Sequence, residues 1–383
     1  MDKPTVQDIF HRFYPAYLDQ YSPSPVQAKV AHNIMNCKTG AYGANVCVCE
    51  DCGFVQIHYN SCRNRCCPMC QAVPKEMWMD ACREDVLDAP YFHLVFTVPD
   101  ILNPVIYSNQ RLLYDALYHA ASSTISELTA DPKHLGAKVG YICILHTWGS
   151  EMNFHPHIHT ILLGGGLASN NQWKDNGENF FLPIRVISKM FRGKYLEELK
   201  RLWEEDKLVF HGTAEKFRNH YTFKELLDSC YGMDWIPHCK KTFNGAQTVI
   251  KYLGKYTHRI AVSNHRIVRM DDDTVTFLVK DYRNEGQWKE LTISGVEFVR
   301  RFLMHVPPRR FVRIRHYGLL CSRTKSQKLT LCRNLLGCKK YLSKLRDMEM
   351  PEILEHLYGI KVCVCKACGG HLGKPQMRMP LRC

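Results

Sequence analysis

The middle of the chain alternates between short apolar runs and a longer segment with helical spacing. Tyr91–Val98 is apolar, rich in aromatic and β-branched residues and followed by Pro99, which predicts a buried strand. Lys138–Thr147 and Pro156–Leu163 have the same character and predict two further strands. Between the first two strands, apolar residues recur at helical spacing over Val105–Leu128, which predicts a helix.

The chain is more polar after the third predicted strand. Residues 167–240 are expected to form an insertion with one helix, and the following segments predict two helices and a charged hairpin. Ser294 and Glu297 have the spacing of a capping box at the start of the last helix. This order predicts an α+β fold in which a mainly antiparallel sheet carries helices on one face. The helices are expected at Lys194–Lys207, Phe243–Arg259 and Ser294–Met304, and the hairpin at Arg266–Met270 and Thr274–Lys280.

Composition and charge narrow the class of protein. Hydrophobic residues make up 45% of the 383 residues, which excludes a mainly disordered chain. No run approaches the roughly 18 consecutive apolar residues of a membrane helix, and Met1–Phe10 lacks the apolar core of a signal peptide. We therefore expect a cytoplasmic protein without membrane contact. Its 51 Lys and Arg outnumber 37 Asp and Glu, and the net charge of +14 favours a polyanion, most often nucleic acid.

The 19 cysteines predict metal binding, because disulfides are rare in a reducing compartment. Two C-x-x-C pairs, Cys49 with Cys52 and Cys67 with Cys70, together offer the four sulfur ligands of a structural zinc ion. The alternative is that these thiols pack as small hydrophobic side chains. Cys47 has no assigned role.

One or two further zinc sites are expected, which gives a total of about two to three zinc ions. The second would use four residues around the first site, unless they are ordinary buried thiols and a surface histidine: His32, Cys37, Cys62 and Cys66. The third would lie in the C-terminal knuckle: Cys363, Cys365, Cys368 and His371, with Cys383, Cys321, Cys332 or Cys338 as alternatives for the fourth ligand.

Candidate catalytic residues lie in two short motifs. His157 and His159 alternate along a predicted strand, so both imidazoles project to one face and could hold a divalent cation. Tyr252 and Tyr256 are one helical turn apart, so both hydroxyls share a face, and the flanking residues are basic. Taken alone, the two histidines could equally be a solvated face of the strand, and the two tyrosines could equally pack in the core. Their conjunction indicates cleavage of a single DNA strand by a tyrosine nucleophile, with a metal ion that neutralises the phosphate.

At these residues the chain resembles a known family. His157-Ile158-His159, the Tyr252 and Tyr256 pair and the segment Ser61–Gln71 (SCRNRCCPMCQ) are similar to the two-tyrosine HUH transposases of the bacterial insertion-sequence ninety-one family. The resemblance covers nearly the whole chain, including Leu145–Gly149, His155–Gly166, Phe298–Gly318 and the late cysteine knuckle. Members of the family are expected to carry His where this chain has Cys66, and either residue can bind zinc.

The resemblance implies rolling-circle transposition through a single-stranded intermediate. Tyr252 and Tyr256 become the nucleophiles, and Mg²⁺ or Mn²⁺ is expected at His157 and His159. His146, at the end of the neighbouring strand, is the first choice for a third ligand. Glu151 is the alternative, because carboxylate oxygen suits Mg²⁺. The expected partners are single-stranded DNA of the element ends and target site, in the cytoplasm and nucleoid of a bacterium.

DNA contacts are expected from the zinc module, the tyrosine helix and a basic stretch near the end of the nuclease region. The chain lacks a G-x-x-x-x-G-K-[ST] phosphate loop, so strand separation is expected from a host helicase or replication machinery. The candidate contacts are Lys251, Lys255, Arg259, Arg300, Arg301, Arg309, Arg310, Arg313 and Arg315, together with Arg63, Arg65 and Lys75 of the zinc module.

Three regions are expected: a zinc- and DNA-binding module at 1–84, an HUH nuclease domain at 85–318 with the insertion at about 167–240, and a basic helical region at 319–383. Two other functions stay open on the sequence. A plasmid replication initiator or relaxase would share the nicking chemistry. A zinc-dependent DNA-binding regulator would bind DNA without catalysis. A hydrolase that activates water at the histidines is a further alternative.

Overall fold

The computed structural model describes residues 3–176, 182–235, 237–243, 249, 254, 261–281 and 284–378. Its centre is an antiparallel sheet with the strand order β11-β4-β5-β3-β7, and the short strand β6 pairs with the end of β5. The strands are β3 (Tyr91–Thr97), β4 (Lys138–Trp148), β5 (Phe154–Leu167), β6 (Trp173–Asp175), β7 (His238–Phe243) and β11 (Ile314–Gly318). The predicted α+β class and the three strongest predicted strands are confirmed.

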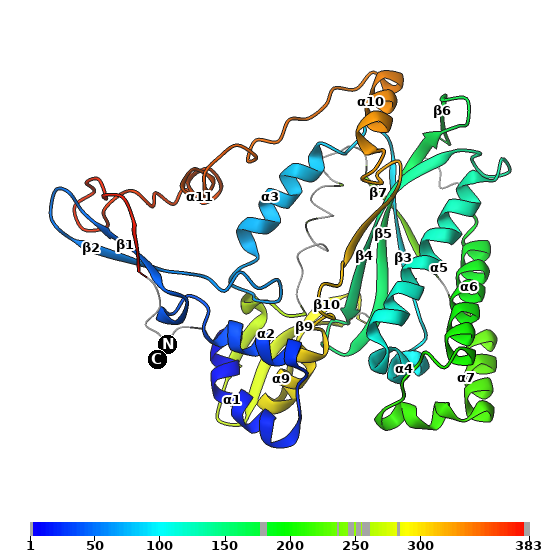
Figure 1. Cartoon of the computed structure of the whole chain (residues 1–383), viewed down its shortest axis with the longest axis horizontal. Helices are drawn as coiled ribbons and strands as arrows, with labels where there is room; N and C mark the ends of the chain where they lie inside the picture. Colours follow the sequence, from blue (N-terminus) through cyan, green and yellow to red (C-terminus); the bar gives the residue numbers. More distant parts are fainter. Residues whose placement is uncertain are drawn as a thin grey trace.

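Four helices cover one face of this sheet, on the right in Figure 1. Ile158 and Leu162 of β5 point toward them, because alternate residues of a strand share a face. The helices within residues 167–240 are part of this core, since the long helix after β6 packs along the helix before β4 and buries Ile187 and Phe191. The helix expected at Lys194–Lys207 therefore begins earlier than predicted. The four helices are α4 (Asn103–Ser108), α5 (Gln110–Ala130), α6 (Ile184–Glu204) and α7 (His220–Gly232).

The helix predicted over Val105–Leu128 is two helices that meet at Asn109. The side chain of Asn109 is buried and donates to the carbonyls of Val105 and Val209, at 2.9 and 2.7 Å. Its Oδ1 accepts from the Val209 amide at 2.8 Å. A buried amide that satisfies the backbone of a distant loop interrupts the helix here.

The opposite face of the sheet also carries helices, which the sequence analysis did not predict. Tyr91, Ile144 and Ile161 pack there against α3 (Ala72–Arg83) and α10 (Lys325–Leu336). The two histidines of the β5 motif alternate with Ile158 and therefore lie on this second face. The sheet is thus sandwiched between two helical layers, and the histidine face is an interior face.

A second hydrophobic core joins the start of the chain to residues 261–306. Phe10 and Phe13 of α1 pack with Phe298 and Phe302 of α9, so residues 1–84 do not enclose a core of their own. Its three-stranded sheet has the order β10-β9-β8. The elements are α1 (Val6–Gln20), α2 (Pro25–Met35), β8 (Ile267–Met270), β9 (Thr274–Asp281), β10 (Gln287–Ser294) and α9 (Gly295–Met304).

The cap predicted for α9 is half formed. The Ser294 side chain accepts from the Glu297 amide at 3.2 Å, as a helix N-cap does. The Glu297 carboxylate does not reach back to Ser294. It pairs instead with Arg300 and Arg301, at 2.6 and 2.7 Å.

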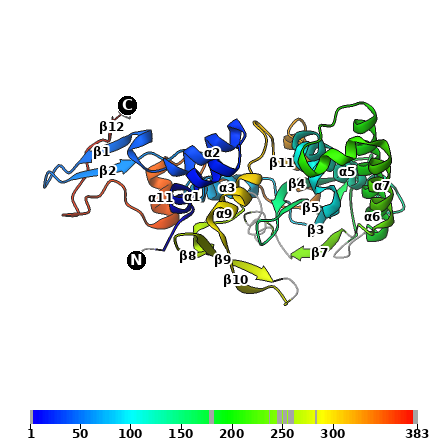
Figure 2. The same cartoon turned by 90° about the horizontal axis from the view of Figure 1, so that it is seen from below.

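The end of the chain returns to its beginning. The hairpin of β1 (Ala44–Val48) and β2 (Val55–Tyr59) is extended by β12 (Gln376–Arg378) in the order β12-β1-β2. Figure 2 shows this ribbon projecting away from the central sheet, with α11 (Met350–Tyr358) beside it. Residues 319–378 therefore do not form a separate tail. Short 3₁₀ turns lie at Gly40–Tyr42, Asp100–Leu102, Gly212–Arg218 and Asn264–Arg266.

Candidate active site and metal centres

Three histidines meet on the interior face of the central sheet. His146 at the end of β4 pairs directly with His157 of β5, and His159 follows two positions along the same strand. One ring nitrogen from each lies within 4.8 Å of the others. All three residues are buried, with at most 9% of their surface exposed. The structure thus brings together both histidines of the motif and the first choice for a third ligand.

Hydrogen bonds orient two of these rings. Nδ1 of His157 lies 2.7 Å from the His155 carbonyl, which can only accept, so the proton of His157 is on Nδ1. Nε2 of His157 then presents its lone pair toward Nε2 of His159, 3.1 Å away. Two ring nitrogens that face each other across this distance are suited to share a cation, and burial removes water as the alternative partner.

His93 is a functional candidate that sequence reasoning missed. It lies on β3, is buried, and its Nε2 is 2.9 Å from Nδ1 of His159. Burial, reinforced by His238 and His157, lowers the pKa of His93 to about 3, so the ring is neutral and can accept the His159 Nδ1 proton. With its proton on Nδ1, His159 carries a lone pair on Nε2, the atom that faces Nε2 of His157. Only the pairing of β3 with β5 reveals this contact, because nothing in the sequence places the two strands side by side.

The alternative ligand Glu151 is not part of this group. Its carboxylate is about half exposed and lies 3.9 Å from the Lys289 ammonium, while its carbonyl accepts from Arg301 at 3.0 Å. Within the described ranges, the ligand set is therefore three imidazoles without a carboxylate. Imidazole suits transition metals better than Mg²⁺, which prefers oxygen.

Both candidate nucleophiles, Tyr252 and Tyr256, lie outside the described residues, as do Lys251, Lys255 and Arg259. Two positions of the same segment are described, and both are buried. Val249 belongs to the cluster on the histidine face of the sheet, with Ile144 and Ile161. Gly254 lies against α3 so closely that an added Cβ would be 2.0 Å from the sulfur of Met79.

The basic stretch divides into paired and unpaired arginines. Arg300 and Arg301 pair with Glu297, and Arg315 pairs with Asp115 and lies over the Tyr118 ring, 3.9 Å from its centroid. The remaining candidates are Arg309, Arg310 and Arg313, and none of them pairs with an acid among the described residues. Arg309 and Arg310 are exposed.

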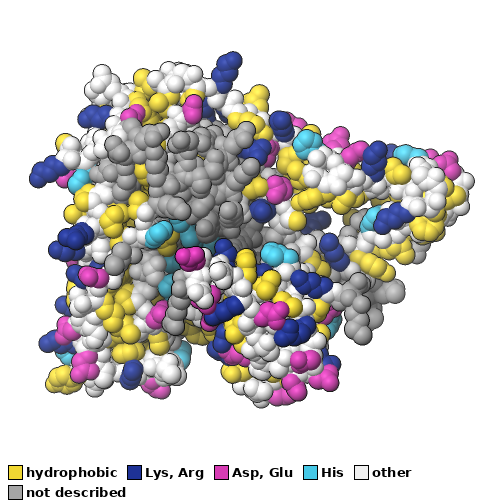
Figure 3. All heavy atoms as spheres, turned by 180° about the vertical axis from the view of Figure 1, so that it is seen from behind, with side chains coloured by type: hydrophobic (Ala, Val, Ile, Leu, Met, Phe, Trp, Pro, Cys, Tyr) yellow, Lys and Arg dark blue, Asp and Glu magenta, His cyan; other side chains and the backbone are white. Residues whose placement is uncertain are grey.

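On the face drawn in Figure 3, the described Lys and Arg side chains are interspersed with Asp and Glu. Of the aromatic residues in this stretch, Phe302 and Phe311 are buried in the core, and Tyr317 is partly buried. Three of the six candidate arginines in residues 300–315 are engaged in ion pairs within the chain.

The first cysteine cluster consists of Cys37, Cys62, Cys67 and Cys70, whose sulfur atoms lie within 4.8 Å of one another. Cys37 follows α2, and the other three lie in the loop before α3. Sγ of Cys70 is 3.4 Å from that of Cys37 and 3.5 Å from that of Cys62. Hydrogen bonds from Cys62 and Cys67 lower the pKa of Cys70, which favours a thiolate. Four convergent sulfur ligands are the composition of a structural zinc site.

This grouping corrects the predicted zinc sites. Cys67 and Cys70 converge with Cys37 and Cys62, so the two C-x-x-C pairs do not form one site, and Cys49 and Cys52 lie in a second cluster with Cys365 and Cys368. A tight turn brings two thiols together but does not determine which other pair it meets.

The second predicted site is corrected in the same way, because two of its four residues are not in the first cluster. His32 is exposed and contacts Asn36, and Cys66 is buried in the second core beside Trp148. Burial raises the pKa of the Cys66 thiol, which is typical of a packing residue.

The predicted C-terminal set is also divided. Cys363 is exposed and His371 lies 3.5 Å from Glu50, so neither belongs to the cluster that contains Cys365 and Cys368. The upstream alternatives Cys321, Cys332 and Cys338 are not in it either, and Cys383 lies outside the described residues.

The described part of the chain has no helix that combines the length and apolar character needed to cross a membrane.

Comparison with known proteins gives two family matches. Residues 140–328 match a family described as "Putative transposase", and residues 9–98 match a "Transposase zinc-binding domain". The "Putative transposase y4qJ" of Sinorhizobium fredii is 40% identical and covers 95% of this chain and 93% of its own length. The "Transposase for insertion sequence element IS801" of Pseudomonas savastanoi pv. phaseolicola is 30% identical and covers 79% of this chain and 72% of its own.

A solved complex of the conjugative relaxase TrwC with oriT DNA aligns with 44% of this chain and 71% of its own, at 13% identity and a TM-score of 0.25. A TM-score this low does not establish a shared fold. The two family matches are more informative, because one contains the first cysteine cluster and the other contains the histidine triad.

We predict that substitution of Cys67 and of Cys66 will have opposite outcomes, although the residues are neighbours. Cys67→Ser removes a ligand of the first cluster and should lower the zinc content by about one ion per chain. Cys66→Ser, the control, removes only a packing thiol and should leave the zinc content unchanged. Elemental analysis of the purified variants measures both, and zinc loss from Cys66→Ser would show that the grouping is incorrect.

We also predict that His93 positions the candidate metal ligand His159. His93→Phe keeps the ring volume but removes the acceptor, and should weaken Mn²⁺ binding about 10- to 100-fold. His93→Gln retains an acceptor oxygen and should lose less affinity. Titration of free Mn²⁺ by electron paramagnetic resonance measures the difference, with the exposed His119→Ala as the control. Unchanged Mn²⁺ affinity in His93→Phe would exclude this role.

Proposed function

Because the chain belongs to the insertion-sequence ninety-one (IS91) family of transposases, we propose that it cuts and rejoins single-stranded DNA at the ends of its element through 5′-phosphotyrosine intermediates. Rolling-circle transposition is the process that this chemistry serves. The observation that carries the proposal is the buried triad of His146, His157 and His159 on one face of the sheet.

The triad is suited to bind a cation at a phosphate. A divalent ion held there would neutralise the charge that develops on a scissile phosphate. The chain itself fixes the geometry, because the His155 carbonyl and the His93 ring set which nitrogen of His157 and His159 is available. Three nitrogen donors without a carboxylate favour Mn²⁺ over Mg²⁺.

Tyr252 and Tyr256 are the proposed nucleophiles. The phenolate oxygen attacks phosphorus, a new P–O bond joins the tyrosine to the 5′-phosphate, and the bond to the 3′ oxygen breaks. That oxygen leaves as a 3′-hydroxyl after it takes up a proton, and the same hydroxyl, or that of a target strand, can reverse the step. Val249 is buried on the histidine face and comes three residues before Tyr252 in the sequence, which supports the assignment.

A mobilisation relaxase or replication initiator would use the same chemistry, and family membership favours the transposase. The exposed Arg309 and Arg310 are the proposed contacts of the chain with the DNA backbone in the described part of the basic stretch. Because these two cations have no acidic partner among the described residues, the affinity for DNA should fall as the salt concentration rises.

The test incubates the protein with single-stranded oligonucleotides that carry the element ends, in Mn²⁺. A covalent protein–DNA adduct is expected. It should survive either single change and disappear when Tyr252→Phe and Tyr256→Phe are combined, and also in His157→Ala, because nucleophile and metal are both required. The exposed Tyr221→Phe is the matched control and should retain the adduct.

Two results would contradict the proposal. Cleavage that continues in the double Phe variant, without an adduct, would indicate a hydrolase that activates water. A protein that binds the element ends but cleaves neither strand would be a non-catalytic regulator.

A further inference from the structure

The second cysteine cluster joins segments more than 300 residues apart in sequence. Sγ of Cys49 lies 3.5 Å from Sγ of Cys368, and Sγ of Cys52 lies 3.8 Å from Sγ of Cys365. All four sulfur atoms are within 4.8 Å of one another. One C-x-x-C pair comes from the turn after β1 and the other from the turn before β12, and each family match ends well before the second pair.

The two turns have matching backbone geometry. The amide of Gly53 donates to the Cys49 carbonyl at 3.1 Å, and that of Gly369 donates to the Cys365 carbonyl at 2.9 Å. Both glycines have positive φ, 70° and 77°, a conformation that favours glycine. In the second turn, the amides of Ala367 and Gly370 each lie 3.4 Å from a cysteine sulfur. Amides directed at sulfur stabilise thiolate ligands.

Backbone pairing holds the two turns in register. Cys49 forms an isolated antiparallel β-bridge with Leu372, and the amide of Glu50 donates to the His371 carbonyl at 3.1 Å. The amide of Gly373 donates to the Val48 carbonyl at 2.9 Å, and β12 continues the pairing along β1. The sulfur positions are therefore set by main-chain contacts between the two ends of the chain.

Apolar burial alone is too small to hold this junction. Among the described residues, its cluster of buried residues consists of Cys47, Cys49, Cys365 and Leu372, two of which are proposed ligands. Around it, hydrophobic side chains such as Ile57 and Met377 are more than half exposed. A small ribbon with so little core needs another source of stability, and a structural metal is the usual one.

We infer that Cys49, Cys52, Cys365 and Cys368 bind one zinc ion that fastens the C-terminal segment to the N-terminal hairpin. The inference does not depend on the proposed nuclease activity. Four sulfur ligands arranged by two turns match a closed, structural zinc site rather than a catalytic one.

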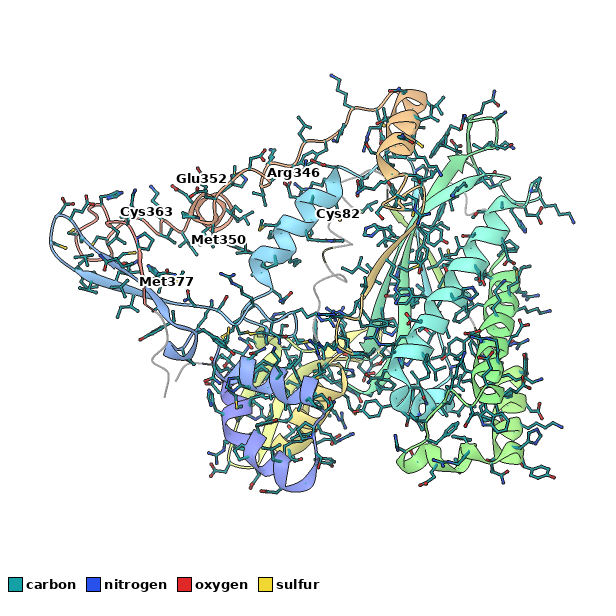
Figure 4. All side chains as sticks on the ribbon, in the orientation of Figure 1. Cys82, Arg346, Met350, Glu352, Cys363 and Met377 are labelled. Atoms are coloured by element: carbon teal, nitrogen blue, oxygen red, sulfur yellow. The ribbon has the colours of Figure 1, made fainter. Side chains whose placement is uncertain are left out.

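The fastened segment has a defined path. After α10 it crosses α3, where Tyr341 and Ser343 donate to Asp80, each at 2.6 Å, and Arg346 pairs with Glu84 at 2.6 Å. Figure 4 shows Arg346 beside α3 near Cys82, then Met350 and Glu352 on α11, and Cys363 close to the ribbon that carries Met377. The zinc ion thus anchors the far end of a strap across α3.

The strap acts on the helix that borders the histidine face. Asp80 and Glu84 are almost buried, with 6% and 11% of their side chains exposed, and the strap supplies their hydrogen bonds. Met79 of the same helix contacts the position of Gly254. Release of the strap would remove these hydrogen bonds and leave Asp80 with Arg83 of its own helix, 3.7 Å away, which is destabilising.

The decisive experiment counts zinc in three variants of the full chain. The first double variant combines Cys49→Ser with Cys52→Ser, and the second combines Cys365→Ser with Cys368→Ser. The quadruple variant carries all four changes. Each double variant should lose about one zinc ion, and the quadruple variant should lose the same single ion and no second one. Cys363→Ser, the matched control, should lose none, because this exposed thiol lies beside the cluster but outside it. A loss of two zinc ions in the quadruple variant would overturn the shared site. An unchanged zinc content in both double variants would overturn it as well.

A second measurement keeps the test independent of folding defects in the variants. A specific protease site inserted after Gly337, at the end of α10, allows the otherwise unchanged chain to be cut in its native state. The C-terminal fragment should stay bound while zinc is present and dissociate when a chelator removes it. A fragment that stays bound after zinc removal would overturn the fastening role, as would one that dissociates with zinc still bound. Neither measurement requires DNA cleavage, so failure of the proposed function would not affect them.

Discussion

The antiparallel pairing of β4 with β5 is the constraint on which the site depends. It places His146 opposite His157 and, because strand residues alternate between faces, aligns His159 with them. A shift of one residue in this register would turn the β5 histidines into the α5 and α6 layer and expose Ile158 to the other face. The large apolar core on that side, with Phe92, Phe96 and Leu162, therefore fixes the metal-binding geometry as well as the fold.

The remaining elements serve this face by enclosing it. β3 adds His93 behind the ligands, and α3 and α10 cover the interior side of the sheet. α3 is in turn held by the C-terminal strap through Asp80 and Glu84. The histidine face and the cysteine clusters are thus parts of one packed arrangement, in which the end of the chain contacts a helix on the same side of the sheet as the histidine triad.

The sequence predicted the local features well and the long-range contacts poorly. Strands at residues 91, 138 and 156 and the histidine pair were accessible because apolar alternation and parity depend only on neighbouring residues. The cysteine groupings were not, since Cys49 has the same local spacing as Cys67 but meets a partner at Cys368. His93 and the two-part core around Phe10 and Phe298 likewise depend on which elements become neighbours after folding.

The central claim, that Tyr252 or Tyr256 cuts DNA with a metal ion bound by the histidine triad, is tested most directly by locating the covalent bond. Mass spectrometry of the protease-digested, nuclease-trimmed adduct would identify the peptide that retains a nucleotide. The account predicts a 5′-phosphate on Tyr252 or Tyr256 and on no other residue. A nucleotide attached elsewhere, or cleaved DNA with every tyrosine peptide unmodified, would contradict it.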